Sequence, residues 1–270
     1  MICFPNCKIN IGLNILQKRE DGYHDIETIF YPLKLQDALE IGVSEETNLI
    51  LYGKDILGTQ DENIVLKAFY LLKKDFNQIR NISISLLKNI PTGAGLGGGS
   101  SDATSMLILL NNYFDLKISH EKMMEYALIL GSDCPFFIKN VPSLAQGRGE
   151  ILTAIDLDVN SYTFVLIKPL IHISTKWAFE NIKPTPNKTS LKEFIQMPIH
   201  TWKNNIKNDF ETPIVNHYPA LKYIKNELYN LGALYSAMSG SGSVFYGIFE
   251  NKISDKILKN TFPNFETYIC

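Results

Sequence analysis

The sequence lacks the features that membrane-spanning, secreted and zinc-binding proteins need. No stretch reaches about 18 consecutive apolar residues, so no segment is expected to cross a membrane. The four cysteines, at positions 3, 7, 134 and 270, show no paired C-x-x-C spacing, which favours thiols over a zinc site or disulfides. Pro5, Lys8 and Asn10 interrupt the apolar residues near the N-terminus, so we expect no signal peptide and predict a cytoplasmic protein.

Neither sign of charge predominates. The 26 basic residues nearly balance the 28 acidic ones, giving a net charge of −2, so no broad basic face argues for nucleic acid. We therefore expect neither a nucleic-acid nor a membrane partner, and an anionic ligand has to be met by local groups such as Lys8. The 270 residues, 45% of them hydrophobic, suffice for one large or two modest domains.

What the sequence does contain is a dense run of glycines. Residues 91–102 read PTGAGLGGGSSD, with a strand-like alternation of apolar residues before them and a helix-like apolar segment after them. Glycine has no Cβ and lets the backbone approach a ligand closely, while a helix N-terminus presents unpaired N–H groups and partial positive charge. Together these features predict a binding site for an anion, most often phosphate.

Two common phosphate-binding motifs do not fit this run, and glycine content alone is also compatible with a flexible loop. A Walker A loop needs Lys after its last Gly, where this chain has Ser100. The G-x-G-x-x-G pattern is met formally by residues 93–98. A dinucleotide-binding fold, however, requires a βαβ unit and an acidic residue about 20 positions on. Asp115 stands near that position, but Pro91 interrupts the passage from strand to loop.

The run resembles the P-x-G-x-G-L-G-G-G-S-S motif of the GHMP kinases (the galactokinase, homoserine kinase, mevalonate kinase and phosphomevalonate kinase superfamily). Three further segments resemble motifs of the same superfamily in the same order, so the resemblance spans residues 5–245. They are PNCKINIGL with REDGYH (5–13 and 19–24), GSDCPFF (131–137) and MSGSGSVF (238–245). The triple glycine and the D-G-Y-H element are similar to the branch that acts on 4-diphosphocytidyl-2-C-methyl-D-erythritol in non-mevalonate isoprenoid biosynthesis.

The order of the expected elements indicates an α+β chain. Strand patterns occur near 2–11, 27–33, 38–43, 48–52, 80–87, 143–148 and 162–168. Helix patterns begin after Asn63, after the glycine run, at 119–130 and over Leu221–Leu231, the last closed by Gly232. The resemblance implies a two-domain GHMP kinase fold. A ribosomal-S5-like, nucleotide-binding and catalytic domain would span residues 1–155, and a ferredoxin-like domain that completes the substrate site would span 156–270.

The resemblance also implies the activity: ATP-dependent phosphorylation of the 2-hydroxyl of 4-diphosphocytidyl-2-C-methyl-D-erythritol. ATP would be the phosphoryl donor, with Mg²⁺ brought by the nucleotide and no metal ligand assigned to the chain. The expected partner is this cytidine-diphosphate-linked small molecule, and the expected state is a monomer or a weak homodimer. Two alternatives stay open: a GHMP kinase of the homoserine or mevalonate type, and a catalytically silent nucleotide-binding member. The Tyr23-His24 pair argues against the first, and retention of both Lys8 and Asp133 argues against the second.

By the same resemblance, Asp133 is the catalytic base and Lys8 its partner. From the residues alone, Asp133 fits equally a turn before Pro135, and Lys8 fits a strand lysine that faces water. The residues expected to bind ATP are Asn63, Lys88, Pro91, Gly93, Gly95, Leu96, Gly97, Gly98, Gly99, Ser100 and Ser101. Lys88 is also compatible with a solvated lysine, and Asp102 fits a carboxylate favoured by the helix dipole as well as a magnesium role, so it is not assigned.

The residues expected to bind the substrate are Asn10, Tyr23, His24, Thr175, Phe179, Gly240 and Ser241. The resemblance implies that Tyr23 and Phe179 stack on the cytosine, that His24 forms a hydrogen bond with it, and that Asn10 contacts the erythritol or phosphate end. Phe179 is equally typical of a helix core residue, and Trp177 is a competing candidate for the stacking ring.

Overall fold

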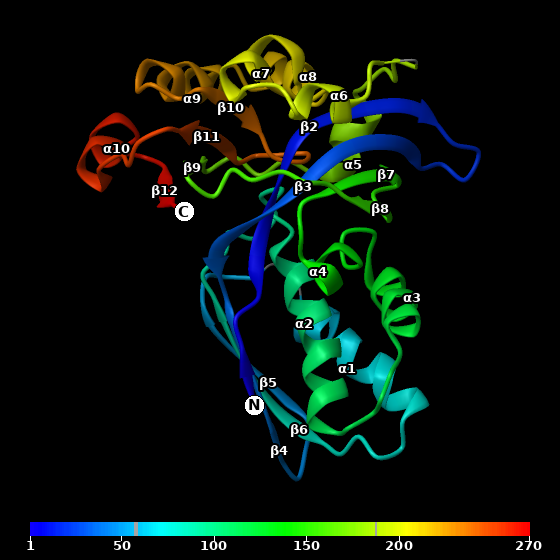
Figure 1. The fold of residues 1–270 in the computed structure, drawn as a ribbon. Coiled ribbons are helices and arrows are strands. Elements are labelled where there is room, and N and C mark those ends of the chain that lie inside the picture. Colours follow the sequence, from blue (N-terminus) through cyan, green and yellow to red (C-terminus); the bar gives the residue numbers. More distant parts are fainter. Residues whose placement is uncertain (57–58, 187) are drawn as a thin grey trace. The chain divides into compact units, whose positions relative to one another are not determined.

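The computed structural model describes residues 1–56, 59–186 and 188–270, and its elements are labelled in Figure 1. The described residues form an α+β chain, as predicted. They divide into two compact units that alternate along the sequence. The first unit comprises Met1–Lys8, Pro32–Thr92 and Gly97–Val141. The second comprises Ile9–Tyr31, Gly93–Leu96 and Pro142–Cys270. The predicted domain boundary at residues 155/156 remains a prediction.

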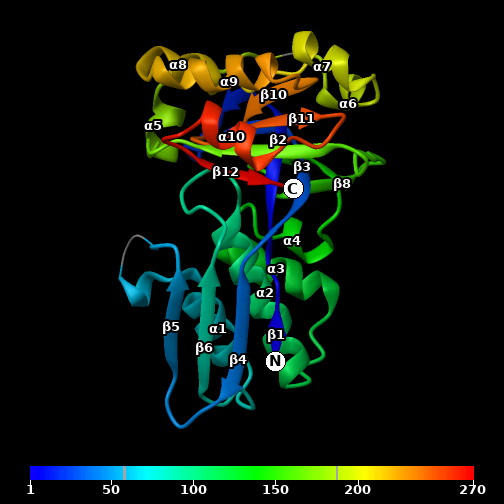
Figure 2. The ribbon, with the colours of Figure 1, turned by 90° about the vertical axis from the view of Figure 1, so that its left-hand side faces the viewer.

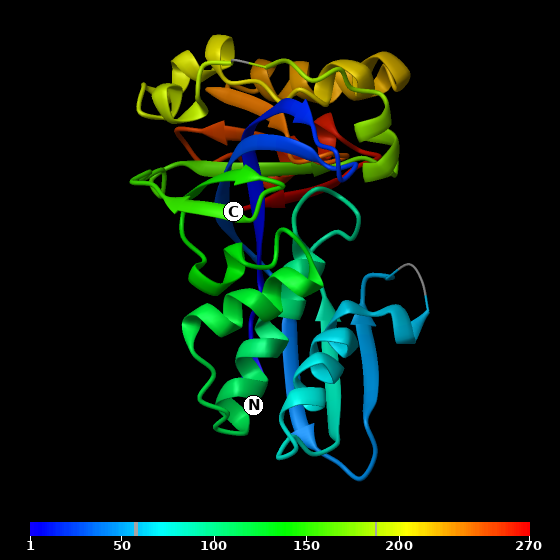
Figure 3. The ribbon, with the colours of Figure 1, turned by 90° about the vertical axis from the view of Figure 1, so that its right-hand side faces the viewer.

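The first unit is a four-stranded sheet with helices on one face. The strand order is β1-β4-β6-β5; β4 pairs antiparallel with β1 and β6, and β5 pairs parallel with β6. Figures 2 and 3, which view opposite sides, show α1, α2 and α3 on the same face of this sheet. The strands are β1 (Ile2–Cys3), β4 (Ala38–Val43), β5 (Asn48–Gly53) and β6 (Ile82–Lys88). The helices are η1 (Gln60–Glu62), α1 (Ile64–Asp75), α2 (Gly98–Tyr113), α3 (His120–Leu130) and α4 (Phe136–Lys139).

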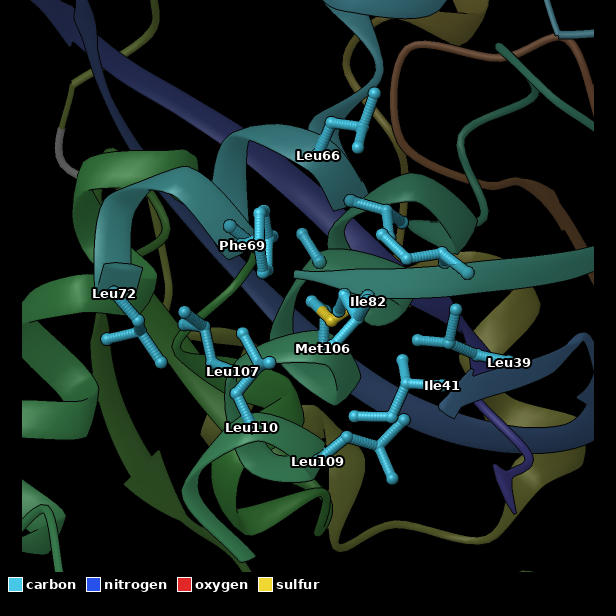
Figure 4. Close-up of a cluster of buried hydrophobic side chains, with 14 of the residues drawn as sticks. Leu39, Ile41, Leu66, Phe69, Leu72, Ile82, Met106, Leu107, Leu109 and Leu110 are labelled. Carbon is cyan, nitrogen blue, oxygen red and sulfur yellow. The ribbon is translucent and has the colours of Figure 1, made fainter. Parts of the chain in front are cut away.

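The core of this unit lies between the sheet and its helices, as Figure 4 shows. Alternate residues of β6 are buried because successive side chains of a strand point to opposite faces. Val65, Phe69 and Leu72 form the buried stripe of α1 at helical spacing, as their sequence pattern predicted. Fully burying an apolar side chain of this size stabilises a fold by about 1.5–3 kcal/mol, so this core fixes the strand end and the helix start that flank the glycine run.

The second unit contains most of one four-stranded sheet, ordered β2-β3-β7-β8, and the whole of another, ordered β10-β11-β9-β12. The start of β2 and the end of β3 belong to the first unit. Helices α7, α8 and α9 run along one face of the second sheet (Figure 3). The strands are β2 (Asn6–Lys18), β3 (His24–Gln36), β7 (Ser143–Gly147), β8 (Ile151–Ala154), β9 (Thr163–Lys168), β10 (Tyr235–Met238), β11 (Phe245–Phe249) and β12 (Glu266–Ile269). The helices are α5 (Thr175–Glu180), α6 (Leu191–Ile195), α7 (Ile199–Asn205), α8 (Glu211–His217), α9 (Ala220–Asn230) and α10 (Asp255–Thr261).

The helix boundaries follow the capping residues in the sequence. The Asn63 side chain accepts a hydrogen bond from the Val65 N–H and begins α1. Gly131 ends α3, and Gly232 follows α9 with a left-handed φ of 96°. Within the described residues, no helix combines the length and the apolar character needed to cross a membrane.

Candidate active site

A lysine and an aspartate far apart in the sequence form an ion pair in the first unit. The Lys8 Nζ lies 3.1 Å from the Asp133 Oδ2. Only 4% of the Lys8 side chain is exposed, against 34% of Asp133. The interpretation of Lys8 as a strand lysine that faces water is therefore wrong. A buried ammonium group next to an accessible carboxylate leaves that carboxylate able to meet a ligand while its charge is compensated.

The turn between α3 and α4 holds Asp133 in place. The Thr104 hydroxyl of α2 donates a hydrogen bond to the Cys134 carbonyl at 2.9 Å, and the Cys134 N–H donates to the Gly131 carbonyl at 3.1 Å. Cys134 itself is buried, and this burial raises the pKa of its thiol to about 11, so it stays protonated. The turn is anchored on both sides of Asp133, which restricts where its carboxylate can point.

The N-terminus of α2 lies next to the lysine of this pair. Gly97 precedes α2 with a left-handed φ of 68°, and a Cβ at this residue would lie 3.1 Å from the Lys8 Cγ and Cε. Gly97 has no side chain to cap the helix, so the first-turn N–H groups of α2 receive no capping oxygen from it. Within the first unit, the structure thus brings together Gly97, the start of α2 and the Lys8–Asp133 pair that the resemblance implied.

The other residues expected to bind ATP in the first unit surround the same helix start. A Cβ on Gly99 would lie 3.8 Å from Ile64, the first residue of α1, directly after the capping residue Asn63. Ser101 is buried and Ser100 is half-buried. Lys88 is buried and forms ion pairs with Asp37 and Asp102, so its side chain is not the solvated lysine that the sequence left open. Direct contact of Asn63 or Lys88 with adenosine remains a prediction.

In the second unit, the first part of the glycine run meets the glycine-rich turn near the C-terminus. The Ser239 hydroxyl donates to the Gly95 carbonyl at 2.8 Å, and a Cβ on Gly95 would lie only 2.1 Å from the Ser239 carbonyl oxygen. Only glycine allows the two backbones to approach so closely. Asn10 joins this group: its N–H donates to the Ser239 hydroxyl at 3.2 Å, and its Oδ1 lies 3.3 Å from where a Cβ of Gly240 would stand.

Thr175, Ser241 and Gly93 make further contacts within the second unit. Thr175 and Ser241 share a hydrogen bond of 3.0 Å between their hydroxyl groups, which joins the start of α5 to the glycine-rich turn. A Cβ on Gly93 would lie 2.9 Å from the His172 ring. Leu96 and Pro91 are buried, which fits a role in holding the loop as well as contact with a ligand.

The expected cytosine-binding residues form an aromatic cluster in the second unit. The His24 and Phe179 rings stack with centroids 4.9 Å apart and an interplanar angle of 23°. Tyr23 is 54% exposed, and the guanidinium of Arg148 lies 4.9 Å from the centre of its ring. Desolvation, with a smaller contribution from Lys18, lowers the pKa of His24, so the imidazole is neutral at pH 7 and one ring nitrogen can accept a hydrogen bond.

The structure separates the two candidate stacking rings of α5. Phe179 contacts His24 on one side and packs edge-on against Phe210, whereas Trp177 packs against His217 and Tyr218. Of the two rings, Phe179 is thus the one that adjoins the D-G-Y-H segment. Its stacking on cytosine remains a prediction.

Arg148 is a member of this cluster that the sequence reasoning did not single out. It lies between Gly147 and Gly149, directly after β7, and the only signal for it was an arginine between two glycines at a strand end. The hairpin that carries Tyr23 is held by Arg19, whose side chain pairs with Asp21 and Asp25 at 3.0 and 2.9 Å. The Arg and Asp of the R-x-D-G-Y-H element therefore shape the turn that presents Tyr23 and His24.

Two family models match the chain. The model of the GHMP kinases N terminal domain matches residues 63–140, and the model of the GHMP kinases C terminal domain matches residues 190–265. The chain belongs to the GHMP kinases.

Among its relatives, a protein from Bacteroides fragilis is 50% identical over 274 residues, covering 100% of this chain and 98% of the relative. A protein from Azobacteroides pseudotrichonymphae is 52% identical over 252 residues, covering 93% of this chain and 94% of the relative. Both carry the name 4-diphosphocytidyl-2-C-methyl-D-erythritol kinase.

Two crystal structures extend the comparison. A 4-(cytidine 5'-diphospho)-2C-methyl-D-erythritol kinase matches with a TM-score of 0.86 at 28% identity, covering 100% of this chain and 98% of its own. A mevalonate kinase matches with a TM-score of 0.77 at 12% identity, covering 100% of this chain and 98% of its own, and shows the same fold. The resemblance drawn from the sequence motifs and the two-domain GHMP kinase fold are both confirmed.

The described residues contain no group of three or more His, Cys, Asp and Glu side chains that could hold a metal ion. Mg²⁺ prefers oxygen ligands and commonly keeps waters and substrate phosphates in its shell. An ion bound chiefly by nucleotide phosphates and water would need few ligands from the protein.

Proposed function

We propose that this chain transfers the γ-phosphoryl group of ATP to the 2-hydroxyl of 4-diphosphocytidyl-2-C-methyl-D-erythritol. The observation that carries the proposal is the Lys8–Asp133 ion pair beside Gly97 at the start of α2. It combines a base, a cation and a phosphate-binding helix start in one unit. Relatives named for this substrate, about half identical over 93–100% of the chain, support the choice of acceptor.

In the proposed reaction, the substrate hydroxyl gives its proton to the Asp133 carboxylate. The hydroxyl oxygen forms a bond to the γ-phosphorus as the bond from that phosphorus to the bridging oxygen breaks, and ADP leaves with the electron pair. Lys8 pairs with Asp133 and would offset negative charge that develops on the transferring group. General-base assistance of this kind contributes about 10²–10⁴ to a rate.

The nucleotide would be held by backbone groups more than by charged side chains. As a GHMP kinase the chain uses ATP, and the first-turn N–H groups of α2 with Gly97, Gly98 and Gly99 would surround its phosphates. Mg²⁺ would arrive with ATP, bound by phosphate oxygens and water, and would neutralise part of their charge.

The cytidine end of the substrate would be recognised by the aromatic cluster of the second unit. Tyr23 and Phe179 would stack on the base, and neutral His24 would form a hydrogen bond with its edge. Asn10, Thr175, Gly240 and Ser241 would contact the rest of the substrate through the polar group they form around the glycine-rich turn. A cytoplasmic location and a monomeric or weakly dimeric state remain predictions from the sequence.

A coupled assay of ADP formation tests the proposal. We expect turnover with 4-diphosphocytidyl-2-C-methyl-D-erythritol and only background with homoserine or mevalonate at the same concentrations. Faster turnover with homoserine or mevalonate would favour the alternative GHMP kinase activities. No ADP with any of the three, from folded protein that binds ATP, would favour the silent nucleotide-binding alternative.

A further inference from the structure

Three charged side chains are buried together in the first unit. Two of them flank residues 91–101, the nucleotide-binding segment: Lys88 precedes this segment and Asp102 follows it. The Lys88 Nζ lies 2.6 Å from the Asp102 Oδ2 and also pairs with the Asp37 Oδ2. Their side chains are between 0 and 3% exposed. Charged residues are seldom buried so completely unless they are paired, so the three residues of this triad depend on one another for their charge balance.

The triad joins three elements that flank the glycine run. Asp37 stands between β3 and β4, Lys88 is the last residue of β6, and Asp102 lies in the first turns of α2. The Asp37 Oδ1 also accepts hydrogen bonds from the N–H groups of Asn89 and Ile90, at 2.6 and 2.8 Å. The entry to the nucleotide-binding segment and the helix that leaves it are thus held by one set of charges.

The charges of the triad do not balance if both carboxyl groups are ionised. One ammonium group then faces two carboxylates, and an uncompensated charge in a buried site is strongly unfavourable. Two carboxyl groups that share a site resolve this conflict when one keeps its proton. With a proton on one acid, the triad has no net charge.

The hydrogen bonds favour a proton on Asp102. The Asp37 carboxyl group already accepts from two backbone N–H groups and from Lys88. Asp102 receives Lys88 on Oδ2 and also interacts with the Asp37 carboxyl group, which favours a proton on Asp102. Within the described part of the chain, the buried Oδ1 of Asp102 has no hydrogen-bond partner. An unpartnered oxygen is tolerated better on a neutral acid than on a carboxylate. Burial accordingly raises the pKa of Asp102, to about 8.

We propose that Asp102 is a positioning residue that works as a protonated acid: it keeps Lys88 and the start of α2 together while leaving the triad without net negative charge when the nucleotide phosphates bind. An ionised Asp102 would place a carboxylate in the first turns of the helix whose N–H groups meet a polyanion, and the two would repel. The proposal deepens the proposed function and rests on it only in taking ATP as the anion.

The titratable groups that face Asp102 come from three parts of the first unit. They are Lys88 from β6, Asp37 from the segment before β4, and Cys3 from β1. Burial raises the pKa of the Cys3 thiol to about 11, so Cys3 stays neutral over this range.

The test is the pH dependence of ATP binding, measured by calorimetry at pH 7 and pH 9 without any acceptor substrate. If ATP binds the protein with protonated Asp102 about tenfold more tightly than with ionised Asp102, ATP affinity should fall about fivefold between pH 7 and pH 9. The change is smaller than tenfold because Asp102 is partly ionised at pH 7 and not fully ionised at pH 9. Asp102→Asn carries a neutral side chain of the same shape, so the ATP affinity of this variant should differ by less than about twofold between pH 7 and pH 9. Asp115→Asn removes a carboxylate from the exposed segment just after α2 and should keep the full dependence of the unaltered protein.

A second measurement does not depend on the variant folding. The ¹³C chemical shift of the Asp102 carboxyl group in the unaltered protein should change between pH 7 and 9. The midpoint of this titration should move to higher pH when ATP is bound. Titration below pH 5, or an Asp102→Asn variant that keeps the pH dependence of the unaltered protein, would overturn the proposal. Neither measurement needs phosphoryl transfer, so failure of the kinase assay and failure of this proposal are separate results.

Discussion

At the scale of single residues, motif spacing could identify the reactive groups but not their surroundings. Lys8 and Asp133 stand in separate motifs, and the sequence left both open to ordinary structural roles. The structure adds the 3.1 Å ion pair and the burial of Lys8. The pairing of Lys88 with Asp37 across 51 positions leaves no trace in local pattern, because long-range ion pairs depend on how strands are arranged rather than on periodicity.

Replacing the proposed base tests its role directly. Asp133→Asn keeps the shape of the side chain but cannot accept the proton, so kcat should fall by about 10²–10⁴. ATP affinity should change little, because the phosphate-binding backbone is untouched. Single-turnover kinetics and ATP calorimetry measure the two effects, with the exposed Asp115→Asn as the matched control. A kcat within threefold of the unaltered enzyme would remove Asp133 from the mechanism.

The aromatic cluster predicts a loss that is confined to the cytidine substrate. If Tyr23 and Phe179 stack on the base, each ring contributes about 1–3 kcal/mol, and Tyr23→Ala should weaken substrate binding by about ten- to a hundredfold. The ring of Tyr23 is half exposed, so this variant is expected to fold. Substrate and ATP dissociation constants measure the effect, and ATP affinity should stay within a small factor.

The two rings of α5 provide an internal control for the same site. Phe179→Ala should weaken cytidine-substrate binding, whereas Trp177→Ala should act mainly on stability because Trp177 packs against His217 and Tyr218. The reverse outcome would assign the stacking role to Trp177. Unchanged cytidine affinity in Tyr23→Ala and Phe179→Ala alike would leave the kinase fold intact but contradict the named substrate.

At the scale of elements, long periodic segments were predictable and short ones were not. The stripe of α1 and its Asn63 cap, the end of α3 at Gly131, and the end of α9 before Gly232 all follow local rules. The helices between 175 and 217 escaped prediction because each has only five to seven residues, fewer than two full helical turns of pattern. Capping serines begin α5 and α6, whereas the N-cap residues of α7 and α8 form no such side-chain hydrogen bond. These short helices depend on tertiary packing rather than on an extended apolar stripe.

The start of α2 gives a prediction at this scale. Gly97→Ala places a Cβ 3.1 Å from Lys8 and Phe137 at a left-handed φ, so the Lys8 side chain must shift and the phosphate-facing backbone must distort. We expect ATP affinity to fall at least tenfold by calorimetry, with a folded circular dichroism spectrum. The strain of the left-handed conformation alone costs about 1–2 kcal/mol.

A matched variant separates that strain from the contact. Gly232→Ala carries a similar positive φ, 96°, but its Cβ would have no atom within 4 Å, and it lies after α9. Both variants should lose a few degrees of thermal stability, and only Gly97→Ala should lose ATP binding. Equal ATP affinity in the two folded variants would contradict the placement of the phosphates at this helix start.

At the scale of the whole molecule, the order of motifs identified the family, but the interleaving of the units could not be foreseen. Residues 9–31 and 93–96 belong to the second unit although the first unit surrounds them in sequence. The long strands β2 and β3 contribute residues to both units. Local periodicity predicts that a segment is a strand but not which strand it pairs with, because pairing is decided by packing across the whole sheet.

The identity of the phosphorylated oxygen tests the central claim most directly. The unaltered protein should convert 4-diphosphocytidyl-2-C-methyl-D-erythritol and ATP into one product for each ADP formed. In the ¹H-coupled ³¹P spectrum, the new phosphomonoester signal should not be split by protons on the carbon that carries the ester, since the 2-carbon bears no hydrogen. Asp133→Asn should give no such signal on the same timescale. A phosphoester signal split by protons on its own carbon, or ADP formed without any phosphoester, would contradict the account.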